Sequence, residues 1–137
     1  MNTDIGSDKI SGPVVYVIDD DNIVRSMLTD MLEESGFLTL SYSSSVKFLK
    51  EYQSASPECI LCDIQMPEIG GLELLRTLKA RGHYPPTIFM SGYTDVAIAE
   101  EAIKMGAIDI LKKPFTGKAL LEKIQIALRV PRDHLAR

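Results

Sequence analysis

The sequence predicts an α/β fold in which five parallel strands alternate with five helices. Two observations lead to this fold class: short, uninterrupted apolar runs recur along the chain, and an amphipathic stretch follows each of them. Apolar runs without alternation are typical of parallel strands that are covered on both faces, and parallel strands need a crossover between them. With 137 residues, 45% of them hydrophobic and 25% charged, the chain has the size and composition of one globular domain.

The first strand–helix pair carries the clearest signals. VVYVI, at 14–18, is apolar and β-branched, as expected of a buried strand. In 22–35 apolar residues repeat at helical spacing, and Gly36 stands where a helix cap is expected. The repeat forms two neighbouring stripes, which consist of Ile23, Met27 and Met31 and of Val24, Leu28 and Leu32.

The other four pairs repeat this alternation, with Gly106 closing the fourth helix and Pro131 ending the fifth. Their strands are expected at 37–41, 59–63, 87–91 and 107–112. Their helices are expected at 44–53, 72–80, 94–105 and 116–130.

The two ends of the chain differ in composition from this central unit, which spans 13–130. Residues 1–12 are polar and lack the apolar core of a signal peptide, so we expect a flexible leader. Residues 131–137 are expected to be a tail or the start of a linker to an output domain. No apolar run approaches the roughly 18 residues that a membrane span needs, which favours a cytoplasmic protein without a membrane partner.

The charge of the chain bears on nucleic-acid binding. A net charge of −4 leaves no broad basic surface for the phosphates of a nucleic acid. A role in transcription would therefore need DNA contact through a separate output domain.

Cysteine and histidine residues do not point to a metal site. Cys59 and Cys62 make a C-x-x-C motif, which at a turn or helix start can bind metal or carry redox chemistry. Here the motif lies in an expected strand, where residues three apart point to opposite faces, so we expect two core residues. His83 and His134 lie apart from each other and from the strand ends, and both are expected to face solvent.

Polar and charged residues stand where the expected strands end. In a right-handed parallel α/β sheet the carboxyl ends of the strands meet at one edge, where such folds bind their ligands. We therefore expect one site that contains Asp19, Asp20, Asp21, Asp63, Ser91 and Lys113.

Several carboxylates at one edge repel one another, and a divalent cation would relieve that repulsion. Oxygen ligands together with water suit Mg²⁺, which prefers octahedral oxygen coordination. The alternative is a solvated turn in which Asp21 or Asn22 caps the next helix. That alternative accounts for Asp21 but not for the acids that accompany Asp63 and Lys113.

Four motifs, in this order, resemble the receiver domain of two-component response regulators: VIDDD, Asp63 followed by Met66 and Pro67, MSG, and LKKPF. The likeness covers about 14–130, and FMSGYTDVAIAEEAIKMGAIDILKKPF is most similar to the FixJ-like branch. Members of that branch usually carry a DNA-binding helix-turn-helix domain after the receiver. The resemblance implies a flavodoxin-like, CheY-like fold with the strand order 2-1-3-4-5.

The resemblance also implies a phosphorylation-activated switch rather than a turnover enzyme. Asp63 would be the phosphoacceptor and would take its phosphoryl group from a histidine of a sensor kinase. Asp20, Asp63 and the backbone carbonyl of Gln65 would bind Mg²⁺, or Mn²⁺ in its place, and Asp19 would act through a coordinated water.

Two further residues match the positions that complete such a site. Lys113 would place positive charge on the phosphoryl oxygens, and Ser91 would supply a hydroxyl that moves to bond the phosphoryl group. A surface lysine and an ordinary strand-end serine are the alternatives, with Lys112 the better candidate for the surface role. The Lys113–Pro114 bond matches a position that is commonly cis in the family.

One position departs from the family pattern: where many receivers carry a Tyr or Phe that moves with the switch hydroxyl, this chain has Ile110. We expect Ile110 to pack in the fold or to contact a partner. The helix at 94–105 is rich in alanine and buries less apolar area than the first helix, so it is the expected mobile element. Its face with 107–112 and 116–130 is the expected surface for homodimerisation on phosphorylation.

Two other classes of function fit part of the pattern. A hydrolase of small phosphoesters would use Asp63 as its nucleophile, but such enzymes usually place a second aspartate two residues later, where this chain has Gln65. A phosphate-independent interaction module would keep the fold without the chemistry. The complete set of acids, hydroxyl and lysine argues against that module.

Overall fold

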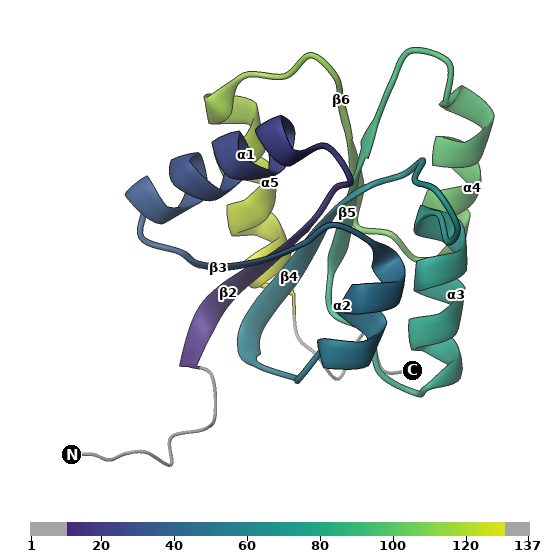
Figure 1. Ribbon diagram of the computed structural model, residues 1–137, viewed down its shortest axis with the longest axis horizontal. Coiled ribbons are helices and arrows are strands. Elements are labelled where there is room, and N and C mark those ends of the chain that lie inside the picture. Colours follow the sequence, from purple (N-terminus) through teal and green to yellow (C-terminus); the bar gives the residue numbers. More distant parts are fainter. Residues whose placement is uncertain (1–10, 131–137) are drawn as a thin grey trace.

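The computed structural model describes residues 11–130, in which five strands alternate with five helices (Figure 1). The strands are β2 (Ser11–Ile18), β3 (Leu38–Tyr42), β4 (Ser56–Asp63), β5 (Thr87–Ser91) and β6 (Asp109–Lys112). The helices are α1 (Asn22–Glu34), α2 (Ser45–Glu51), α3 (Gly71–Ala80), α4 (Val96–Met105) and α5 (Gly117–Leu128). The tail expected at 131–137, with His134, and residues 1–10 of the expected leader lie outside the described residues, whereas Ser11 already belongs to β2.

All neighbouring strands pair in parallel, in the order β3-β2-β4-β5-β6. Counted along the chain this is the expected order 2-1-3-4-5, so the predicted fold class is confirmed. Helices α1 and α5 cover one face of the sheet, and α2, α3 and α4 cover the other (Figure 1). The strand order changes direction between β2 and β4, and ligand sites of such sheets lie outside the carboxyl ends of strands at that point.

The central strands are apolar on both sides. In β2, Tyr16 belongs to the core cluster beneath α2, α3 and α4, whereas Val15 and Val17 belong to the cluster beneath α1 and α5. Cys59 and Cys62 follow the same alternation, one in each cluster, and both are buried free thiols. Burial raises the pKa of both thiols above the ordinary value. The C-x-x-C motif is therefore part of the core, as predicted.

Side-chain caps mark the start of three helices. Asp21, Ser44 and Thr116 have extended backbones, and their side chains accept hydrogen bonds from the first turns of α1, α2 and α5. Helix α4 differs, because it begins at Val96, later than predicted, and Asp95 before it makes no such bond. Other bounds move slightly: β4 starts before 59, at Ser56, and β6 starts after 107, at Asp109.

The two apolar stripes of α1 differ in burial. Leu28 and Leu32 are buried, whereas Ile23 and Met27 are 77% and 56% exposed. The sheet therefore covers one stripe and leaves large apolar side chains of the other on the surface. Within residues 11–130 no helix combines the length and apolarity that a membrane crossing requires.

A buried carboxylate near the start of β4 organises the amino end of the sheet. Glu58 is 2% exposed, its oxygens lie 3.0–3.1 Å from the hydroxyls of Tyr16 and Tyr52, and it accepts a hydrogen bond from the Ala55 N–H at 2.9 Å. Nε2 of His83 lies 3.3 Å from Glu58, and its ring stacks on Tyr52. His83 is thus half-buried and hydrogen-bonded, and the prediction that it faces solvent is wrong.

Candidate functional site

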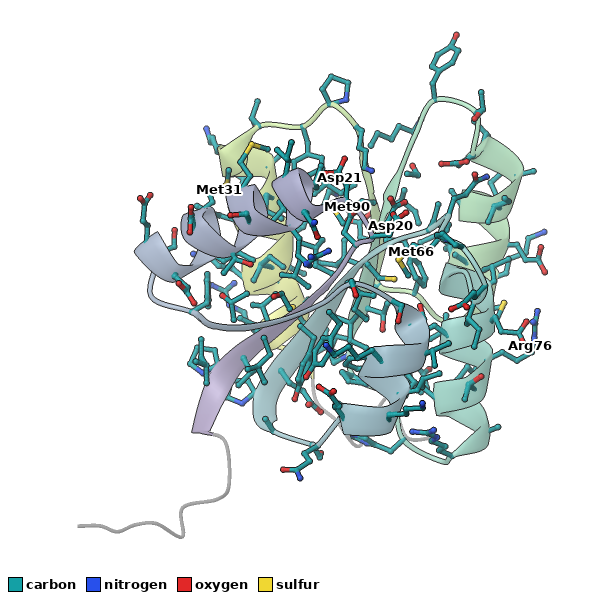
Figure 2. The ribbon with its side chains drawn as sticks, viewed as in Figure 1. Asp20, Asp21, Met31, Met66, Arg76 and Met90 are labelled. Atoms are coloured by element: carbon teal, nitrogen blue, oxygen red, sulfur yellow. The ribbon has the colours of Figure 1, made fainter. Side chains whose placement is uncertain are left out.

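The carboxyl ends of β2, β4, β5 and β6 meet at one edge of the sheet and carry the predicted site residues. Figure 2 shows Asp20 and Asp21 at this edge, beside the start of α1. Backbone pairing of Asp63 with Met90 sets β4 and β5 in register there. The predicted site residues at or just beyond these strand ends are Asp19, Asp20, Asp63, Ser91 and Lys113.

Asp63 ends β4, and two donors orient its carboxylate. The backbone N–H of Gln65 donates to Oδ1 at 3.2 Å, and the ammonium group of Lys113 donates to Oδ2 at 3.2 Å. The Asp63 side chain is 14% exposed, so it is largely surrounded by protein but open on one side. A carboxylate held in this way presents a fixed nucleophile or ligand to that side.

The loop after Asp63 is held against the sheet at Gly71. The N–H of Gly71 donates to the carbonyl of Ile64 at 2.9 Å, and a Cβ at Gly71 would lie 2.6 Å from a ring carbon of Phe89. Glycine is therefore required by close approach at this position. The loop held in this way keeps the Gln65 N–H within hydrogen-bonding distance of Asp63.

Lys113 reaches Asp63 from the end of β6. Its own N–H donates to the carbonyl of Ser91 at 2.9 Å, which ties the segment to β5, and its peptide bond to Pro114 is cis. The side chain is 36% exposed, with Nζ on Asp63 as described above. Lys112, in contrast, is exposed, which fits the surface role predicted for it.

The carboxylates of three acids lie close together. One oxygen from each of Asp19, Asp20 and Asp63 lies within 4.8 Å of the other two. Asp19 is only 1% exposed. The N–H of Asp21 donates to Asp19 Oδ1 at 2.9 Å, whereas Oδ2 is buried without a hydrogen-bond partner in the described part of the chain. Burial raises the pKa of Asp19, the Asp21 N–H opposes that rise, and the nearby charge of Asp63 adds to it.

This donor set fits a hard divalent cation. Three carboxylates in one place, one of them with a buried oxygen that lacks a partner, offer oxygen ligands of the kind that Mg²⁺ and Mn²⁺ prefer. Gln65 lies in the loop beside this cluster, because its N–H donates a hydrogen bond to Asp63. Metal binding by the Gln65 carbonyl stays a prediction.

Asp21 has a different role from its two neighbours. Its Oδ1 accepts hydrogen bonds from the N–H groups of Ile23 at 2.9 Å and Val24 at 3.2 Å, so it caps α1. The alternative that the sequence offered for this acid is therefore the correct one. Arg25 donates through Nη1 to the carbonyl of Asp19 at 2.6 Å and fixes the turn between β2 and α1.

Ser91 is 2% exposed at the end of β5, and the loop after it leads to α4. In this loop Asp95, which is 5% exposed, accepts a hydrogen bond from the N–H of Gly92 at 2.7 Å. Sequence reasoning missed Asp95, because an acid directly before a helix is ordinarily a cap. The only available signal was its position four residues after Ser91.

A cavity of about 320 Å³ extends from this site between α4 and β6. Ser91 and Lys113 line it at the site, and Val96, Ala99 and Ile110 are among its other lining residues. Ile110 is half-buried and packs against the core cluster. Ile110 thus packs in the fold, which is one of its two predicted roles.

Known proteins resemble this chain in sequence. The family model described as the response regulator receiver domain matches residues 15–125. The transcriptional regulatory protein FixJ of Azorhizobium caulinodans is 43% identical over 114 residues, which cover 83% of this chain and 54% of FixJ. The response regulator protein TodT of Pseudomonas putida is 39% identical over 124 residues, which cover 90% of this chain and 54% of TodT. The chain thus spans about half the length of these curated relatives.

A solved structure gives the same result for the fold. Full-length FixJ from B. japonicum matches with a TM-score of 0.81 and 37% identity, over 88% of this chain and 59% of that one. The sequence similarity and the strand order agree. The chain therefore belongs to the receiver domains of two-component response regulators, in their FixJ-like branch.

Proposed function

We propose that this protein is a phosphorylation-activated switch in which Asp63 accepts a phosphoryl group from a histidine of a sensor kinase. The observation that carries the proposal is the setting of Asp63. Its carboxylate is oriented by the Gln65 N–H and by Lys113, and it lies beside Asp19, whose Oδ2 lacks a partner among the described residues. Such a group is ready to react or to bind a cation rather than to stabilise the fold.

The transfer needs only an oriented carboxylate and nearby positive charge. An oxygen of Asp63 bonds to phosphorus while the P–N bond of the phosphohistidine breaks, and the departing imidazole takes up a proton. Lys113, at 3.2 Å from Oδ2, lies where it can donate to the arriving phosphoryl oxygens. Mg²⁺ held by Asp20, Asp63 and the Gln65 carbonyl, with Asp19 acting through a water, would supply the charge that offsets repulsion between carboxylates and phosphoryl group.

Ser91 links this chemistry to α4. Its side chain is buried at the site end of the cavity between α4 and β6, so a hydroxyl that turns toward the phosphoryl group draws the following loop with it. The only buried residues of α4 are Ala99 and Ala102, whereas α1 buries Leu28 and Leu32. Because α4 buries smaller side chains, it is the proposed mobile element.

The surface of α4, β6 and α5 is the part of the protein that we propose changes on phosphorylation and then contacts a partner. Val96 and Ile103 on α4 and Ile126 on α5 are large apolar side chains that are 54%, 45% and 55% exposed. Apolar surface of this kind suits a homodimer that forms after phosphorylation. DNA contact and control of transcription would belong to a separate output domain, in a cytoplasmic protein, in keeping with the regulatory names of FixJ and TodT.

The proposal is tested by weighing the intact protein after incubation with acetyl phosphate and Mg²⁺. We expect a gain of one phosphoryl mass, which is absent without Mg²⁺ and absent in Asp63→Asn. Asp21→Asn is a matched control, because Asp21 lies in the same acidic run but caps α1, and asparagine is also a good cap. This control should gain the phosphoryl group as the wild type does.

The competing functions give different results in the same experiment. A folded wild-type protein that stays unmodified would support the phosphate-independent interaction module. Continuous release of phosphate from a small phosphoester, without a stable mass gain, would support the hydrolase.

A further inference from the structure

Asp95 occupies the position of a helix cap but does not act as one. It directly precedes α4 and is 5% exposed, yet its side chain makes no hydrogen bond to the first turn of that helix. Its φ and ψ of −99° and 20° differ from the extended backbone of Asp21, Ser44 and Thr116, which cap α1, α2 and α5. The first turn of α4 thus lacks the acceptor that three other helices have.

The carboxylate of Asp95 points back toward the site instead. Its Oδ2 accepts the hydrogen bond from the Gly92 N–H at 2.7 Å, and the Asp95 N–H donates to the Gly92 carbonyl at 3.3 Å. These two bonds close the segment between Ser91 and α4 into a compact turn. A hydrogen bond to an ionised carboxylate is stronger than one between neutral groups, so the first of them is the main restraint on this turn.

Gly92 supplies the first backbone donor after Ser91. It lines the same cavity as Ser91 and Lys113, at the edge of the sheet where Asp63 ends β4. A phosphoryl group on Asp63 would bring strong acceptor oxygens and negative charge to that edge. The Gly92 N–H is a suitable donor for those oxygens, but the Asp95 carboxylate already occupies it.

We propose that Asp95 is a positioning residue that holds the Ser91–Gly92 segment in its unphosphorylated arrangement by occupying the Gly92 N–H. The inference rests on the proposed phosphorylation of Asp63. Phosphoryl oxygens compete for the Gly92 N–H and repel the Asp95 carboxylate, which is thereby released. The released carboxylate can accept hydrogen bonds from the uncapped first turn of α4, so one residue couples the chemistry at Asp63 to the start of that helix.

The test compares two variants of Asp95 by phosphorylation rate and by the amide signal of Gly92. In Asp95→Ala the rate of phosphoryl gain from acetyl phosphate and Mg²⁺ should rise about tenfold, as expected when one opposing charge-assisted hydrogen bond is removed. Asp95→Asn keeps an acceptor oxygen without the charge and should give a smaller rise. In both variants the Gly92 amide resonance of the unphosphorylated protein should leave its wild-type position, and it should move further in Asp95→Ala, where the N–H loses its acceptor, than in Asp95→Asn.

Glu100→Ala is the matched control for charge. Glu100 is an exposed acid on α4 that lines the same cavity but has no bond to Gly92 among those of the described residues. This variant removes the same charge from the neighbourhood and should keep the wild-type rate and the wild-type Gly92 resonance.

The outcomes separate this inference from the proposed function. A wild-type or slower rate in both Asp95 variants, or a Gly92 resonance that does not move when the wild type is phosphorylated, overturns the inference and leaves the proposed function standing. A wild type that never gains the phosphoryl group overturns both.

Discussion

The two ends of β4 lie beside buried carboxylates that are surrounded in opposite ways. At the amino end, Glu58 is 2% exposed and has two tyrosine hydroxyls, a backbone N–H and the ring of His83 against its oxygens. At the carboxyl end, Asp19 is 1% exposed, with one oxygen on a backbone N–H and the other without a partner in the described residues. Asp20 and Asp63 add further negative charge beside it.

The difference separates a structural acid from acids that serve a reaction. A buried carboxylate is tolerated when hydrogen bonds replace the water that it has lost, and otherwise it destabilises the folded state. Glu58 meets this condition within the fold. Asp19, whose Oδ2 lacks a partner in the described residues, would meet it only when a cation binds beside Asp20 and Asp63, which is the behaviour expected of a functional site.

Removal of the satisfied acid should have the largest effect on stability. Glu58→Ala leaves the hydroxyls of Tyr16 and Tyr52 and the Ala55 N–H without their acceptor, so we expect the free energy of unfolding to fall by about 3 kcal/mol. Urea denaturation measures this change. Glu51→Ala is the control, because Glu51 is exposed at the end of α2 and its loss should change stability little. Equal stabilities of the two variants would remove the contrast between the two ends of β4.

Metal addition should act only at the other end. At concentrations about 10 to 100 times the dissociation constant, Mg²⁺ should raise the free energy of unfolding by about 1–3 kcal/mol. Asp20→Asn should lose most of this gain with little change in the metal-free protein, because Asp20 is exposed. Asp30→Asn, which alters an exposed acid on α1, should keep the gain. The same Mg²⁺ response in both variants would show that the metal binds elsewhere.

The smallest expected effect has the opposite sign to that of Glu58. Because burial raises the pKa of Asp19, its charged form is disfavoured in the folded protein, and Asp19→Asn should stabilise the metal-free protein, by less than Glu58→Ala destabilises it. Asparagine keeps an oxygen for the Asp21 N–H and adds a donor beside the other acids. Urea denaturation in the presence of a chelator measures the change. A loss of stability as large as that of Glu58→Ala would mean that Asp19 is a structural acid too.

The carboxyl edge was predictable because its residues follow features that the sequence displays. Asp63, Ser91 and Lys113 each come at the end of an apolar run, and a parallel sheet must bring those ends together. Asp21 could be placed only as one of two alternatives, because the choice between cap and ligand depends on the direction of its side chain.

Other contacts left no local signal. Glu58 meets Tyr16 and His83, which are 42 and 25 residues away in sequence, and no periodicity marks such a pair. Asp95 reads as a cap, and only the backbone conformation of its loop turns the carboxylate toward Gly92. The two stripes of α1 are equally apolar, so the pattern could not show that Ile23 and Met27 would stay exposed.

The central claim is that Asp63 itself carries the phosphoryl group. The most direct measurement is to treat the phosphorylated protein with borohydride, which reduces an acyl phosphate to an alcohol, and to locate the altered residue by tandem mass spectrometry of its peptides. We predict homoserine at position 63 and nowhere else. Homoserine at position 19 or 20, with Asp63 unchanged, would contradict the account.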